Sequence, residues 1–120
     1  MSELISNHFE LVDACRSAGL WYVGSYMLEF LMRKEQWENP ETKQSFIRYM
    51  FTEYGDGVCD KDIAGTRTRV NAIIRIIESR KVEDALELVL EADDSKLGCT
   101  ESKVNAKETL ARLRDGRIRY

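Results

Sequence analysis

Few side chains in this 120-residue sequence are of the types that carry out nucleophilic or metal-based chemistry. It contains one histidine, His8, and three cysteines, Cys15, Cys59 and Cys99, which lie far apart along the chain. A cysteine nucleophile needs a nearby base, usually histidine, and a zinc site usually shows cysteines in closely spaced pairs. The sequence has neither arrangement. We therefore predict no catalytic nucleophile, no metal and no cofactor, and three reduced thiols in a reducing compartment.

The next candidates for metal binding are three acidic residues near a glycine-rich turn: Asp56, Asp60 and Asp62, around Cys59. A calcium loop places acids at alternate positions before its glycine and a glutamate at its last position, and the spacing here differs. The neighbouring glycines lack the third glycine and the preceding strand of a phosphate-binding loop. The sequence therefore predicts a solvated loop. No acid sits in an apolar context that would shift its pKa, so an enzyme with paired carboxylates is the least favoured class of function.

Residues 60–74 are the strongest remaining candidate for a functional site. We expect a short helix over 60–64, a turn containing Gly65 and a second helix that begins at Thr66. This is the arrangement of a helix-turn-helix motif that binds nucleic acid. Arginine contacts guanine edges or phosphate, and asparagine pairs with adenine. The recognition helix would present Arg67, Thr68, Asn71 and Arg75. The chain has a net charge of −3, however, whereas a dedicated DNA-binding domain is usually basic, so nucleic-acid binding is the alternative rather than the main prediction.

Charge in the second half of the chain alternates in blocks. Residues 66–81 carry five basic side chains and one acid, residues 82–101 carry seven acids and one lysine, and residues 102–120 carry six basic side chains and two acids. These blocks would neutralise one another if the acidic helix packs between the two basic ones. Otherwise the basic blocks form a site for nucleic acid or an acidic partner. The candidate residues are Arg67, Asn71, Arg75, Lys103, Lys107, Arg112 and Arg114, continued by Arg117 and Arg119.

Hydrophobic periodicity predicts the helices that must position these side chains. We expect helices over residues 3–17, 21–37, 40–54, 66–79, 82–92 and from 100 or 102 to 114, with a polar loop over 93–98. One proline and seven glycines leave little room for a β fold with many turns. The predicted fold is all-α: a compact bundle of five or six helices that forms a single domain over residues 1–120.

Local signals mark several of the helix ends. Asn39 is a good N-cap, and Pro40 at the first helical position loses nothing because its missing N–H would be unpaired there. In the helix over 66–79, the apolar side chains predicted to form one buried face are Val70, Ile73, Ile74, Ile76 and Ile77. A turn is expected over 79–81, since the apolar stripe changes face between this helix and the next. Ser2 would cap the first helix, which would end at Gly19. Its buried stripe would consist of Ile5, Phe9, Val12 and Cys15.

Nine of the eleven aromatic residues lie between Trp21 and Tyr54. The helices over 21–37 and 40–54 are therefore predicted to form the hydrophobic centre, shielded from water. Such a concentration exceeds what a chain of this length is expected to hide, which favours a homodimer or a groove for a partner.

We expect neither a signal peptide nor a transmembrane segment. The first residues lack a basic region followed by an apolar run, and the most apolar stretch, residues 20–32, contains Glu29 and is followed by Arg33 and Lys34. We expect a cytoplasmic protein without membrane association. The predicted function is non-enzymatic binding of another protein, as a small regulator, inhibitor, adaptor or complex subunit, with DNA or RNA binding through the helix near 66–79 as the alternative.

Overall fold

The computed structural model describes residues 4–55, 60–97 and 101–118, and within these ranges the regular secondary structure is helical. The helices are α1 (His8–Ala18), α2 (Leu20–Met32), α3 (Lys34–Glu38), α4 (Pro40–Met50), the π-helical turn η1 (Phe51–Gly55), α5 (Ile63–Glu78), α6 (Val82–Glu91), α7 (Asp94–Leu97) and α8 (Glu101–Arg114). The all-α prediction is confirmed for the described residues. The predicted number of helices was too low, because α2 and α3 replace one predicted helix and α7 lies in a predicted loop.

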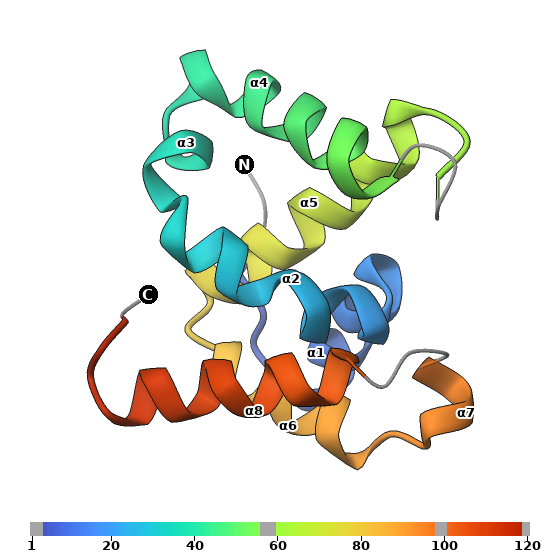
Figure 1. Ribbon diagram of the computed structural model, residues 1–120, viewed down its shortest axis with the longest axis vertical. Helices are drawn as coiled ribbons and strands as arrows, with labels where there is room; N and C mark the ends of the chain where they lie inside the picture. The colour runs from blue at the N-terminus through green and yellow to red at the C-terminus, as the bar shows by residue number, and fades with distance from the viewer. Residues whose placement is uncertain (1–3, 56–59, 98–100, 119–120) are drawn as a thin grey trace.

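Helix α2 is the centre of the molecule. It packs along α8 on one side and also contacts α6, α5 and α1, while α4 lies on the far side of α2 from α8 (Figure 1). Its side chains Tyr22, Val23, Met27 and Phe30 have no exposed surface. This agrees with a helix that is apolar around nearly its whole circumference and is therefore buried on several sides.

All nine aromatic side chains between Trp21 and Tyr54 are buried or half-buried in a single copy of the chain. The α4 side chains Phe46, Ile47 and Met50 complete this core, and the radius of gyration is 13.3 Å. A single folded unit of this length is expected at ~13–14 Å. The predicted hydrophobic centre is therefore confirmed. One copy is enough to cover it, which removes the reason for expecting a homodimer from the aromatic residues.

The predicted helix over 21–37 is broken at Arg33, whose backbone leaves the helical region (φ −110°, ψ 25°). Three hydrogen bonds stabilise the break. The indole Nε1 of Trp37 donates to the carbonyl oxygen of Phe30 at 2.9 Å, and Arg33 binds Glu29 at 2.8 Å and the Tyr49 hydroxyl at 3.2 Å. The bend turns Trp37 into the core and joins the end of α2 to α4, contacts that the helical periodicity of the sequence does not reveal.

Helix α1 begins later than predicted and presents a different face to the core. Its N-cap is Asn7, whose side chain accepts from the Glu10 backbone N–H, and it ends at Gly19 with a positive φ of 91° as expected. The predicted Ser2 cap lies outside the described residues. Phe9, predicted to be buried, is 80% exposed. The buried stripe consists of Leu11, Ala14, Cys15 and Ala18.

Helix α5 runs without interruption from its N-cap Asp62, and Gly65 lies inside its first turn. The predicted turn at Gly65 was therefore wrong, and with it the separate short helix of a helix-turn-helix arrangement. The Asp62 side chain accepts from the Ala64 N–H at 2.9 Å, so the helix is capped three residues before the glycine. The predicted buried face of this helix is confirmed: Val70, Ile73, Ile74, Ile76 and Ile77.

The turn between α5 and α6 lies where the change of apolar face predicted it. Arg80 adopts a positive φ of 59°, and the Lys81 N–H donates to the carbonyl oxygen of Ile76 at 3.1 Å. Asn39 and Pro40 likewise begin α4 as predicted, with the Asn39 side chain accepting from the Glu41 N–H.

Candidate functional site

The candidate basic residues are divided between two helices that have different neighbours. Arg67, Asn71 and Arg75 lie on α5, which packs mainly on α1. Lys103, Lys107, Arg112 and Arg114 lie on α8, which packs mainly on α2 and α6, and Arg117 follows the end of α8. The structure therefore does not assemble the predicted residues into one continuous site.

Ion pairs occupy most of the basic side chains of α8. Arg114 contacts Glu83 at 3.2 Å and Glu87 at 3.1 Å, both on the acidic helix α6. The other pairs on or beside α8 are Lys103–Asp94, Arg112–Glu108 and Arg117–Asp115. Lys107 is exposed, as are Arg67 and Asn71 on α5, and Arg119 lies outside the described residues. Between α6 and α8, the alternating charge blocks thus compensate one another.

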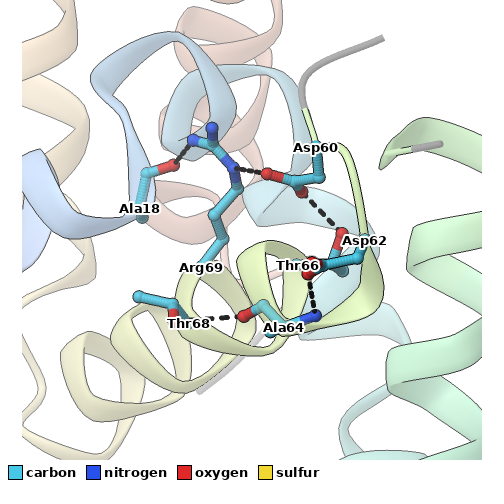
Figure 2. Close-up of polar contacts among 7 residues, drawn as sticks. All are labelled: Ala18, Asp60, Asp62, Ala64, Thr66, Thr68 and Arg69. Atoms are coloured by element: carbon cyan, nitrogen blue, oxygen red, sulfur yellow. Dashed lines mark hydrogen bonds and ion pairs between the residues drawn. The ribbon is translucent and has the colours of Figure 1, made fainter. Parts of the chain in front are cut away.

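Asp60, predicted to lie in a solvated loop, is buried, and its side chain is only 5% exposed. Its Oδ1 accepts from Arg69 Nε at 3.2 Å, and its Oδ2 accepts from Thr66 Oγ1 at 2.6 Å (Figure 2). Arg69 also donates to the carbonyl oxygen of Ala18, at the end of α1 (Figure 2). The prediction was wrong because the partners of Asp60 come from a later helix turn and from a segment far back in the chain.

Three glycines make room for this cluster. A Cβ atom on Gly65 would lie 2.6 Å from Asp60 Oδ1, one on Gly55 would lie 2.6 Å from Thr66 Oγ1, and one on Gly19 would lie 2.8 Å from an Arg69 nitrogen. The Arg69 guanidinium also lies 5.6 Å from the centre of the Trp21 ring. Because these contacts are all internal, the cluster joins η1 and α5 to the junction of α1 and α2 and leaves little capacity for a ligand.

Of the side chains considered for nucleophilic chemistry, the structure describes His8 and Cys15, and it does not bring these two together. His8 is exposed at the start of α1, whereas Cys15 is buried, and burial raises the pKa of its thiol to about 12. A protonated thiol is a poor nucleophile. Cys59, Cys99 and Asp56 lie outside the described residues. Among the described residues, no group of three or more histidine, cysteine or acidic side chains could hold a metal ion.

A surface groove runs between α1 and α6. It consists of two hollows of about 320 Å³ and about 460 Å³ that share Leu88 and Glu91. His8 and Leu11 on α1 face Asp84 on α6 in the first hollow, while the second is lined by later residues of both helices. The two helices therefore run beside the groove in the same direction. Each packs mainly on other helices, α1 on α5 and α6 on α8 and α2, which leaves the space between them open.

The floor of the groove is apolar and one lip is acidic. The half-buried apolar residues of the floor are Val12, Leu20, Trp21, Leu88 and Ala92, while Leu11 and Cys15 also line the groove but are at most 3% exposed. Asp84, Glu87 and Glu91 follow one another along the α6 lip, and the two basic residues, Lys81 and Arg16, lie toward opposite ends of the groove. The helix over 82–92 was predicted, but its acids were expected to face the two basic helices. Nothing in the sequence shows that α1 lies beside it.

Of the described helices, none is long and apolar enough to cross a membrane. Comparison of the chain with known protein families, curated proteins and solved structures found no match.

Proposed function

We propose that this chain is a non-catalytic protein-binding module that acts as a small regulator, inhibitor, adaptor or complex subunit. The observation that carries the proposal is the groove between α1 and α6, an open channel with an apolar floor and charged lips. Apolar concave surfaces with polar rims are typical of sites where proteins bind one another.

Both walls of the groove are fixed in place by residues that pack in the hydrophobic core. Leu11 and Cys15 on α1 are buried against the neighbouring helices, as are Ala85, Leu86 and Val89 on α6. A preformed site loses less conformational freedom on binding than one that must become ordered. This rigidity favours recognition of a partner without a change in fold.

The nucleic-acid alternative has less support. Its two structural requirements were a turn at Gly65 and a concentrated basic face, but α5 is continuous and the basic residues are divided between α5 and α8. Ion pairs with neighbouring acids also reduce the positive potential of α8.

Site-specific photo-crosslinking tests the proposal. A photoreactive amino acid replaces Phe9, which lies on α1 one helical turn before the groove residue Val12 and is 80% exposed. The matched control position is Val104, an apolar residue on the outer face of α8 that is 64% exposed. In cells that naturally contain this protein, we expect the Phe9 probe to form a discrete covalent adduct with another protein and the Val104 probe to form none. Absence of an adduct at Phe9, or the same adducts from both positions, would contradict the proposal.

A further inference from the structure

We infer that the groove between α1 and α6 binds an amphipathic helix of another protein, with the apolar side chains of that helix on the groove floor and its basic side chains along α6. This inference rests on the proposed function and names the class of partner.

The dimensions of the groove suit a helix. Helix α1 has 11 residues and α6 has 10, so each wall is ~15–16 Å long, which corresponds to about three helical turns of a partner. Leu88 belongs to both hollows, and the other half-buried apolar residues, Val12, Leu20, Trp21 and Ala92, line the second. An amphipathic helix that lays its apolar face into a hydrophobic groove is a recurrent mode of recognition.

The acidic residues of the α6 lip indicate that the partner is positively charged. Asp84, Glu87 and Glu91 occur at helical spacing, so their carboxylates form one row along α6. Glu87 is shared with Arg114, but no described residue forms an ion pair with Asp84 or Glu91, and both are exposed. A partner helix with lysine or arginine at the same spacing would place its basic side chains opposite this row.

The opposite lip differs in character. On α1 the groove is lined by the exposed Asn7, His8 and Arg16 and by the half-buried Val12, and Arg16 lies 3.9 Å from its own helix neighbour Asp13. The lining residues of this lip include no acid, and Lys81 places a positive charge at the start of α6. The complementary helix has its basic residues toward the middle of α6, away from Lys81 and from the α1 lip, an arrangement that also orients it in the groove.

Three synthetic peptides of about 14 residues test the inference with the full-length protein. The first is an amphipathic helix of leucine and lysine. The second has the same composition in a scrambled order, so that its apolar and basic residues do not lie on separate faces of a helix. The third has the order of the first, with glutamate in place of lysine. Binding is measured by isothermal titration calorimetry and located by amide chemical shifts. We expect only the first peptide to bind and to shift the amides of α1 and α6.

Paired charge reversals provide the decisive comparison. Asp84→Lys with Glu91→Lys should weaken binding of the first peptide about tenfold or more. The control, Glu35→Lys with Glu53→Lys, changes the net charge equally at exposed acids of α3 and η1 and should leave the affinity within about twofold. Thermal unfolding of all variants establishes that they are folded.

Several results would overturn the inference: no binding of the first peptide, equal binding of the second or third, shifts confined to other helices, or equal losses in the two double variants. A homodimer in sedimentation that only Asp84→Lys with Glu91→Lys dissociates would show that a second copy occupies the groove, and would overturn it as well. If the peptides fail but the Phe9 crosslink to a partner protein persists, the proposed function stands and only the partner class is wrong. If the crosslink is also absent, both fail.

Discussion

At the level of single residues, the pairing of Asp60 with Arg69 is the most buried ion pair among the described residues. The carboxylate is buried, two side chains donate to it, and Arg69 connects it to the end of α1. Removal of one member of a buried ion pair leaves the other charge without compensation, which usually destabilises a protein by ~3–5 kcal/mol. The Arg69 side chain is 20% exposed, so water offsets part of that loss.

We therefore expect Asp60→Ala to lower the free energy of unfolding by about 2–4 kcal/mol. Asp62→Ala is the matched control, because it removes an aspartate two residues away that only caps α5, and such caps contribute about 1 kcal/mol. Urea denaturation of both variants measures the difference. Equal losses would show that the buried pair contributes no more than an exposed helix cap.

Glu10 provides a pH-dependent contribution at the start of α1. Its carboxylate accepts from the Ser6 backbone N–H at 2.7 Å and from the Ser6 hydroxyl at 2.8 Å. These bonds, the backbone bond first, lower the pKa of Glu10 below its ordinary value of 4.5. A pKa that is lower in the folded state favours folding above the unfolded value, and this contribution is lost as pH falls through the folded value.

Glu10→Gln should therefore be less stable than the unmodified protein at about pH 7, and the difference should shrink as the pH falls below about 4. Urea midpoints measured across this range test the expectation. Glu53→Gln is the control: Glu53 is exposed, and no described residue donates a hydrogen bond to its carboxylate. A Glu10→Gln difference that does not change with pH would show that the charge of Glu10 does not stabilise α1.

At the level of elements, the close packing of α2 on α8 depends on small side chains. A Cβ atom on Gly24 would lie 2.7 Å from the backbone oxygen of Ser102 and 2.8 Å from Val89. The Ser102 hydroxyl bonds the carbonyl oxygen of Trp21 at 3.0 Å and lies 3.0 Å from the Ser25 hydroxyl. The glycine thus allows both α8 and α6, one wall of the groove, to approach α2 closely.

Gly24→Ala has two opposing effects on the free energy of unfolding. Helix propensity alone favours alanine by about 1 kcal/mol, whereas the crowded contact disfavours it by ~1–3 kcal/mol. Because the nearest atom belongs to the backbone and cannot rotate away, we expect a net loss of about 1–2 kcal/mol and a lower thermal midpoint. A raised midpoint would mean that α2 and α8 move apart without loss of stability.

At the level of the whole molecule, acidic and basic faces lie close enough to compensate one another. Arg114 lies between two acids of α6, and the other described basic residues of α8 that form ion pairs do so with acids on or near the same helix. Exposed pairs of this kind stabilise a fold by only about 0–1 kcal/mol each. Their larger effect is on the surface potential, because they reduce the attraction of α8 for polyanions.

We expect the protein to pass through a heparin column without retention at about 0.15 M salt. A protein that binds nucleic acid through several phosphate contacts is retained and then released steeply as salt rises. Reversal of Arg67 and Arg75 to glutamate should change nothing in this assay. Strong retention that this double variant abolishes would favour the nucleic-acid alternative over the proposed function.

What the sequence by itself determined is local. Asn39 and Pro40 predicted the start of α4, the change of apolar face predicted the turn before α6, and the isoleucines of α5 predicted its buried face. Each of these signals acts over a few residues, through capping bonds or the periodicity of one helix, so it can be read without knowledge of the rest of the chain.

Only the tertiary structure decided which distant segments meet. It placed Asp60 beside Arg69 and the end of α1, bent the predicted second helix at Arg33, turned Phe9 outward and opened a groove between α1 and α6. These features depend on how several helices share one core, and the free energy of that packing belongs to contacts between residues far apart in the chain. No pattern within a single helix records them.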